Sequence, residues 1–165
     1  CHFDKLLEAS GRLADGHAPD IILAEPVGSC TDLVNAVITP LRAVYADQFD
    51  VAPYMVLLDP HRALDALAAS GPTGFSKKIT YLYKMQQNEA DILVINKADT
   101  LSGDQLTAVN ALVAQNFPQA TAVAASALTG VGFEQILPLL DNRDSKVGRN
   151  PVKVDYGRYT EAEAG

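Results

Sequence analysis

"ADILVINKADTL", residues 90–101, is the stretch of sequence that decides the fold. It begins with a continuous apolar run, Ile92–Ile95, and places Asn96, Lys97 and Asp99 directly behind that run. A short apolar run bounded by polar residues is typical of a strand that is buried on both faces of a parallel sheet. The stretch therefore predicts a central strand whose carboxyl end carries an amide, an ammonium group and a carboxylate.

Similar apolar runs recur along the chain and alternate with helical patterns. Further strands are expected at Ile21–Ala24, Tyr54–Leu58 and Thr121–Ala125. Helices are expected at Asp4–Leu13, at Thr31–Val44 with Pro40 as an end or kink, at Arg62–Ala69, at Phe75–Gln87, from an N-cap at Ser102 to about Asn116, and at Phe133–Leu140. This alternation predicts an α/β fold, with a mostly parallel sheet flanked by helices on both faces and right-handed crossovers.

Composition narrows the classes of function. The chain has 165 residues, of which 48% are hydrophobic, and a formal net charge of −7. This acidic balance argues against non-specific nucleic-acid binding, which requires a basic face. No apolar run approaches the roughly 18 residues of a membrane span. With only two cysteines, Cys1 and Cys30, a reducing cytoplasm is the expected location and a disulfide scaffold is not expected.

Ligands of open α/β sheets bind beyond the carboxyl ends of the strands, where Asn96, Lys97 and Asp99 are expected. A carboxylate can accept two hydrogen bonds from the N1 and 2-amino groups of guanine, and adenine offers no such pair of donors. Asn96 can support the loop and bond the acceptor side of the base, while the Lys97 stem can lie along the ring. These residues predict a guanine site. The alternative is an ordinary solvated turn.

A second loop corroborates this interpretation. Ser126 and Ala127 follow the last expected strand, and their backbone can offer an N–H group to the guanine carbonyl oxygen. Gly130 and Gly132 then lead into the closing helix. Taken alone, the pair is equally typical of a common strand-to-helix turn. Asp59, which ends the second expected strand, either lines the same site or belongs to a turn made by the neighbouring proline.

The third polar strand end lies in "ILAEPVGSCTDL", residues 22–33. Glu25 ends the first expected strand, and Gly28 follows three positions later. A carboxylate there can hold Mg²⁺ through water or orient the attacking water, and the Gly28 N–H can meet a γ-phosphate. We therefore predict that Glu25 and Gly28 are the catalytic, phosphate-sensing residues. The alternative is a Pro-Val-Gly turn followed by a helix N-cap.

In this order and spacing, Glu25-x-x-Gly28, Asn96-Lys97-x-Asp99 and Ser126-Ala127 resemble the CobW/HypB/UreG GTPases of the SIMIBI class. The stretches "ILAEPVGSCTDLVNAVITPLR" and "VDYGRYTEAEA" look like the CobW branch, named for cobalamin synthesis. The resemblance implies a P-loop NTPase-like fold and a cytoplasmic GTPase that binds GTP, GDP and Mg²⁺. It also implies delivery of Zn²⁺, Co²⁺ or Ni²⁺ to a client metalloprotein, with dimerisation across the nucleotide face.

The sequence departs from the family pattern at one place. It contains no G-x-x-x-x-G-K-[ST] phosphate loop, which in the family lies at the N-terminus ahead of a Cys-x-Cys-Cys metal motif. Cys1 stands where the last cysteine of that motif would fall, so the resemblance implies that Cys1 is a metal ligand. A single thiol cannot hold Zn²⁺ alone. We therefore expect a chain that lacks its N-terminal segment, is inactive by itself and binds nucleotide weakly.

Two domain segments follow from this interpretation: a partial GTPase domain over residues 1–141, and an exposed connection and tail over residues 142–165. One alternative function is a non-catalytic, P-loop-less module that recruits a protein partner. Another is a Rossmann-type dehydrogenase or transferase, against which the lack of a G-x-G-x-x-G after any strand argues.

Overall fold

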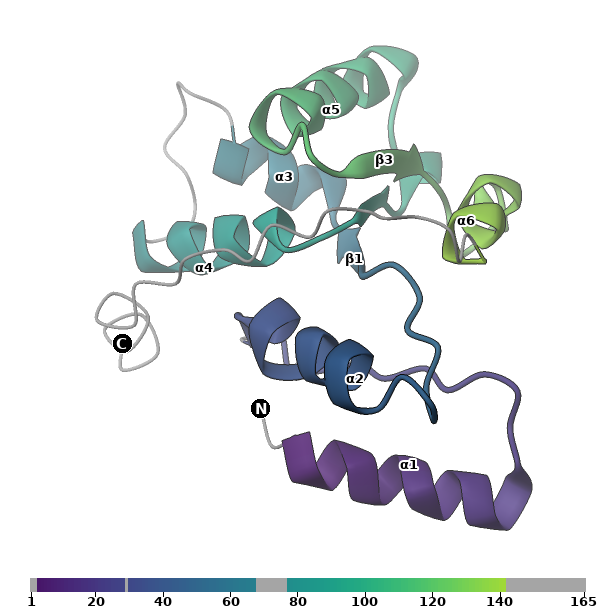
Figure 1. The fold of residues 1–165 in the computed structure, drawn as a ribbon. Helices are drawn as coiled ribbons and strands as arrows, with labels where there is room; N and C mark the ends of the chain where they lie inside the picture. The colour runs from purple at the N-terminus through teal and green to yellow at the C-terminus, as the bar shows by residue number, and fades with distance from the viewer. Residues whose placement is uncertain (1–2, 29, 68–76, 142–165) are drawn as a thin grey trace.

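The computed structural model describes residues 3–28, 30–67 and 77–141 (Figure 1). Its centre is a parallel three-stranded sheet in the order β1-β2-β3, formed by β1 (Met55–Leu58), β2 (Ile92–Ile95) and β3 (Thr121–Ala124). Met55, Ile92 and Thr121 lie side by side at the start of the three strands. The strands expected at these positions are confirmed, with ends that shift by at most one residue.

Helices cover both faces of the sheet, as the sequence predicts. On one face α3 (Pro60–Leu67) and α5 (Gly103–Asn116) pack against Leu93 and Ile95 of β2. On the other face α6 (Phe133–Leu140) packs through Ile136 against Ile92 and Val94. Because all four β2 residues are buried, the strand needs apolar side chains at every position, which explains its continuous apolar run.

Local signals fix the helices next to the sheet. Ser102 and Gln105 form a capping box at the start of α5: the Ser102 hydroxyl accepts from the Gln105 N–H at 3.3 Å, and the Gln105 side chain accepts from the Ser102 N–H at 2.9 Å. The helix α4 (Lys77–Asn88) leads into β2. The expected α5 and α6 are confirmed, and α3 and α4 differ from their predicted bounds by up to two residues.

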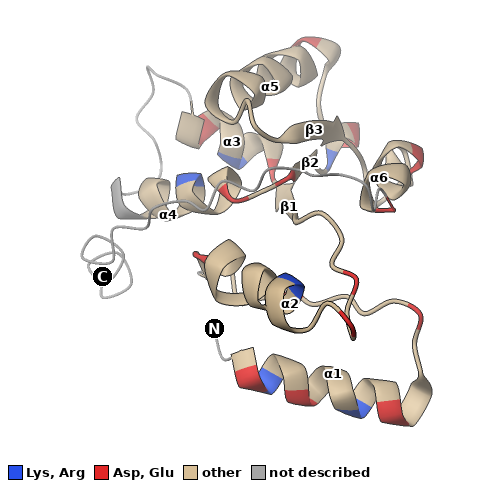
Figure 2. Ribbon diagram, in the orientation of Figure 1, with Lys and Arg blue, Asp and Glu red and all other residues tan. Residues whose placement is uncertain are grey.

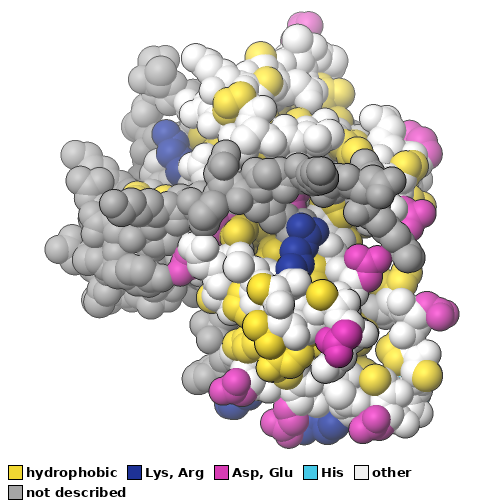
Figure 3. Space-filling view, viewed as in Figure 1, with side chains coloured by type: hydrophobic (Ala, Val, Ile, Leu, Met, Phe, Trp, Pro, Cys, Tyr) yellow, Lys and Arg dark blue, Asp and Glu magenta, His cyan; other side chains and the backbone are white. Residues whose placement is uncertain are grey.

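The N-terminal elements lie apart from the sheet (Figure 1). They are α1 (Phe3–His17), the π-helix η1 (Val34–Ile38) and α2 (Thr39–Val44), in which Pro40 occupies the first turn. Acidic and basic residues are interspersed along α1 (Figure 2), and Arg12 pairs with Glu8 at 2.8 Å. Hydrophobic side chains gather on the surface over α2 (Figure 3).

The strand expected at Ile21–Ala24 is wrong. This segment is irregular and exposed: the side chains of Ile21 and Leu23 are 77% and 91% exposed. A strand persists only where its N–H and C=O groups find a neighbouring strand. Within the described residues, β1 pairs with β2 alone and no strand lies beside residues 21–24. The apolar composition of this segment therefore predicts a strand, but no described strand lies beside it to accept and donate the hydrogen bonds that a strand needs.

Several expectations fall outside the described residues, namely the role of Cys1 and the exposed connection and tail over residues 142–165. In the part of the chain that the structure describes, no helix has both the length and the apolar character needed to cross a bilayer.

Candidate functional site

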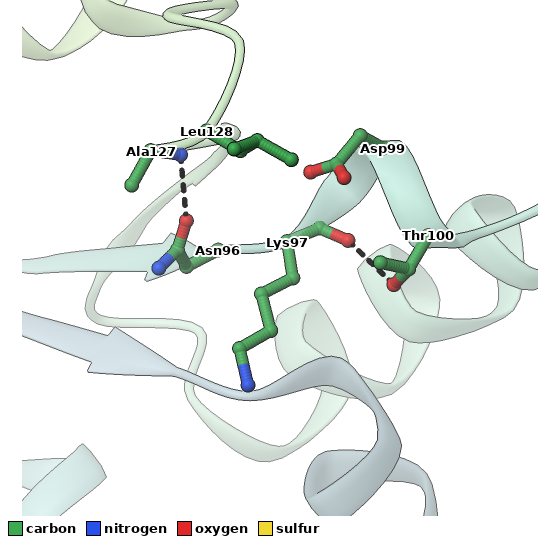
Figure 4. Close-up of a pocket in the computed structure, with 6 residues that line it drawn as sticks. All are labelled: Asn96, Lys97, Asp99, Thr100, Ala127 and Leu128. Carbon is green, nitrogen blue, oxygen red and sulfur yellow. Dashed lines mark hydrogen bonds between the residues drawn. The ribbon is translucent and has the colours of Figure 1, made fainter.

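The carboxyl ends of the three parallel strands meet at one edge of the sheet, and the candidate site lies there. The loops that follow β2 and β3 enclose a pocket of about 490 Å³ (Figure 4), a volume within the usual range for small-molecule sites. Its lining residues are Asn96, Lys97, Asp99, Thr100, Ala127 and Leu128. Four of the predicted base-site residues, Asn96, Lys97, Asp99 and Ala127, are thus brought together.

Asn96 ties the two loops to each other. Its side-chain oxygen accepts a hydrogen bond from the Ala127 N–H at 3.0 Å, and its own N–H donates to the Leu58 carbonyl at the end of β1 at 3.0 Å. The Ala98 N–H adds a second link between the loops, to the Ala125 carbonyl at 3.0 Å. The supporting role predicted for Asn96 therefore has a geometric basis that joins all three strand ends.

Asp99 lies in the short 3₁₀ turn η2 (Ala98–Thr100) that follows β2. Its side chain is exposed and lines the pocket on the same side as Leu128 (Figure 4). Within residues 3–28, 30–67 and 77–141, no hydrogen bond or ion pair engages this carboxylate. Both of its oxygens therefore remain available to donors of a ligand.

Lys97 has a left-handed backbone conformation, and its side chain forms an ion pair with Asp59. Its φ of 59° lies in the left-handed region, which is uncommon for a residue with a Cβ. Its ammonium group donates to the Asp59 carboxylate at 2.9 Å. Burial alone would raise the pKa of Asp59. The hydrogen bonds from Lys97 and from the N–H groups of Arg62 and His61 outweigh that effect, so the pKa of Asp59 is lowered.

The backbone N–H groups of Ser126 and Ala127 in the second loop are already engaged. Ser126 is buried, its N–H donates to the Val131 carbonyl at 2.9 Å, and its hydroxyl accepts from the Thr129 N–H at 3.2 Å. The Ala127 N–H is bonded to Asn96. A base oxygen would therefore share the Ala127 donor with Asn96 or use the neighbouring Leu128 N–H. The sequence analysis did not single out Leu128, whose only signal is its place in this loop.

The structure does not bring Glu25 and Gly28 to the pocket. The Gly28 carbonyl accepts a hydrogen bond of 2.6 Å from the side chain of Gln86. Gln86 lies in the last turn of α4, which precedes the amino end of β2. Glu25 and Gly28 are both exposed. The described segment therefore lies near the edge of the sheet opposite to Asp99, and the phosphate-sensing role of these two residues remains a prediction.

A buried carboxylate that the sequence analysis did not single out holds the chain beyond Gly28. Glu89 is 4% exposed, and its oxygens accept hydrogen bonds from the Asp32 N–H and from the Leu33 N–H, the latter at 2.9 Å. Asp32 has a φ of 62°, and such a left-handed residue beside a helical one aims successive N–H groups at one anion. Burial raises the pKa of Glu89 although these hydrogen bonds act to lower it. Glu89 lies far along the sequence from Asp32 and Leu33, so no short sequence pattern predicts these hydrogen bonds.

No predicted metal ligand can be placed from the described residues. Cys1 lies outside them, and within them no group of three or more His, Cys, Asp or Glu side chains is arranged to hold a metal ion. Cys30 is half-buried, and its carbonyl accepts from Gln86 at 3.1 Å. The metal expected from the family resemblance therefore remains a prediction about residues beyond this part of the chain.

A parallel sheet with a ligand-sized pocket at the carboxyl ends of its strands is the arrangement of α/β nucleotide-binding proteins. Residues 1–124 match the family model described as "CobW/HypB/UreG, nucleotide-binding domain". The chain therefore belongs to the CobW/HypB/UreG family, and the match covers most of its length. Comparisons with curated proteins and with solved structures give no match.

Proposed function

We propose that this chain carries the guanine-recognition part of a GTPase and that Asp99 selects the base. The observation that supports the proposal is the Asp99 carboxylate, which lines the pocket without a bonding partner among the described residues. Guanine presents two adjacent donors, N1–H and the 2-amino group, that a carboxylate accepts together. Adenine would leave a carboxylate oxygen without its donor, which a polar site penalises strongly.

The other pocket residues shape the site around this pair of bonds. Asn96 fixes the distance between the two loops through Ala127. Ala127 and Leu128 lie across the pocket from Lys97 (Figure 4), and their backbone N–H groups can serve the guanine carbonyl oxygen. The backbone of both loops is thus fixed before the ligand arrives, which lowers the entropic cost of binding.

The described residues do not supply a magnesium or phosphate site beside this pocket, because neither Glu25 nor Gly28 lines it and the sequence has no G-x-x-x-x-G-K-[ST]. We assign hydrolysis to the full-length protein, with Mg²⁺ neutralising the phosphate charge. The family to which the chain belongs supports a further proposal: a cytoplasmic, CobW-type metallochaperone that couples hydrolysis to delivery of Zn²⁺, Co²⁺ or Ni²⁺. Cys1 would contribute one metal ligand, and a client metalloprotein and a second copy of the protein would be its partners.

Titration calorimetry of the full-length protein with GDP and with ADP tests the proposed base recognition. We expect GDP to bind more tightly than ADP in the wild type, and Asp99→Ala to abolish that preference. If Asp99→Ala retains the preference for GDP, the assignment of Asp99 is wrong.

The second candidate is a binding module without turnover, since these 165 residues themselves contain no G-x-x-x-x-G-K-[ST]. GTP hydrolysis by the full-length protein supports the enzyme. Binding of a client without any nucleotide-dependent change supports the module.

A further inference from the structure

The loop after β1 contacts one pocket residue, Lys97, through the carboxylate of Asp59. Asp59 follows β1 directly, and its two oxygens have different partners. Oδ1 accepts from the N–H groups of His61 at 3.0 Å and Arg62 at 3.2 Å, at the start of α3. Oδ2 accepts from the Lys97 ammonium group at 2.9 Å. The helix start therefore fixes the carboxylate, and the fixed carboxylate in turn holds the lysine.

The backbone of Lys97 is held by Thr100, in the turn η2 that follows β2. The Lys97 carbonyl accepts from the Thr100 hydroxyl at 2.8 Å and from the Thr100 N–H at 3.0 Å. The Thr100 hydroxyl in turn lies 3.3 Å from Nε2 of His61. Lys97 is thus held at its ammonium group by Asp59 and at its carbonyl by Thr100, which contacts His61. A left-handed residue with a Cβ persists only where its surroundings determine it in this way.

The direction of the lysine side chain follows from these contacts. Lys97 lines the pocket, and its side chain extends away from Asp99 toward the loop after β1 (Figure 4). Its side chain is 58% exposed, so without Asp59 the stem would sample many rotamers in solvent. Fixing such a side chain when a ligand binds has an entropic cost, which a stem that is already ordered avoids.

From these contacts we infer that Asp59 is a positioning residue of the base site. It holds the stem of Lys97 extended along one side of the pocket, where the methylene groups form an apolar surface for the face of a purine ring. The inference rests on the proposed function, because it assumes that the pocket receives the base. Asp59 then contributes to affinity, whereas Asp99 alone decides between guanine and adenine.

A double-mutant cycle in the full-length protein tests this role. Asp59→Asn keeps a side-chain oxygen for the start of α3 and removes the charge that binds Lys97, and Lys97→Met keeps an apolar stem without the ammonium group. Exposed ion pairs of this kind correspond to about a two- to fivefold change in an equilibrium constant. We expect each variant to raise the Kd for GDP by that factor and the double variant to raise it no further. The ratio of the GDP and ADP dissociation constants should stay at the wild-type value.

Asp65→Asn is the matched control, because it removes an equally charged but exposed side chain from α3, and it should leave GDP binding unchanged. Should Asp59→Asn fail to fold, Lys97→Met tests the pair from its other partner without touching the start of α3, and unchanged GDP affinity in that variant overturns the inference. If the increases of the Kd for GDP in the two single variants multiply in the double variant, the inference is also overturned. Failure of the wild type to prefer GDP over ADP overturns the proposed function and the inference together, whereas a guanine preference with multiplying effects overturns the inference alone.

Discussion

Replacing Gly132 by alanine should destabilise the protein more than the same change at Gly130. Both glycines lie in the loop between β3 and α6, with φ of 88° at Gly132 and 81° at Gly130. A Cβ at Gly132 would lie 2.4 Å from the Ala124 carbonyl oxygen and 2.8 Å from the Ala125 Cα, whereas a Cβ at Gly130 would meet nothing within 4 Å. The two changes therefore share their backbone cost and differ in their steric contacts.

The magnitude follows from these two contributions. A residue with a Cβ in the left-handed region costs about 1–2 kcal/mol, and both variants carry this term. Gly132→Ala adds the cost of overpacking, about 1–3 kcal/mol or more, because the atoms it meets belong to backbone and cannot rotate away. The effect of alanine on the unfolded chain is common to both variants and cancels in the difference.

Urea unfolding of the full-length protein, followed by circular dichroism, measures this difference. We expect the free energy of unfolding to fall by about 1–2 kcal/mol in Gly130→Ala and by about 2–5 kcal/mol in Gly132→Ala. Because Ala125 leads directly into Ser126 and Ala127, Gly132→Ala should also weaken GDP binding. Equal losses of stability in the two variants would refute the packing of Gly132 against the end of β3.

Two further predictions concern hydrogen bonds between a side chain and the backbone of another segment. Burial raises the pKa of Glu89 above its unfolded value, so its contribution to stability is greatest below the usual pKa of a glutamate and is lost as the pH rises through the raised pKa. The free energy of unfolding of the wild type minus that of Glu89→Gln should therefore decrease as the pH rises from about 4 to 7; a difference independent of pH would contradict this. Asn96→Ala removes the bond to the Ala127 N–H and should cost about 1 kcal/mol in urea unfolding, with faster hydrogen exchange of the Ala127 amide. Unchanged exchange would show that Asn96 does not tie the loops.

Much of the sheet and its helices could be predicted because their signals are local. The buried run Ile92–Ile95 needs only its own four apolar residues to indicate a central strand. The start of α5 follows from its N-cap Ser102, which forms a capping box with Gln105. The meeting of the loops after β2 and β3 follows from a general property of parallel sheets. These features require no knowledge of distant contacts.

The features that the sequence could not predict depend on residues that lie far apart along the chain. The run Ile21–Ala24 has the composition of a strand, but a strand also needs a neighbour, and composition does not reveal one. Gly28 bonds to Gln86, a residue of α4 far along the sequence, and its predicted contact with the nucleotide stays a prediction. Asp59 makes the expected turn contacts at the start of α3, but its bond to Lys97 joins residues far apart in the sequence and could not be predicted.

The most direct test of the central claim is the exchange of one acceptor for a donor at Asp99. Asp99→Asn replaces one carboxylate oxygen by an NH₂ group, and xanthine carries a carbonyl oxygen where guanine carries its 2-amino group. Titration calorimetry of the full-length protein should show that the wild type prefers GDP over xanthosine diphosphate and that the variant reverses this order. If Asp99→Asn still prefers GDP, the carboxylate does not contact the base and the proposed recognition of guanine is wrong.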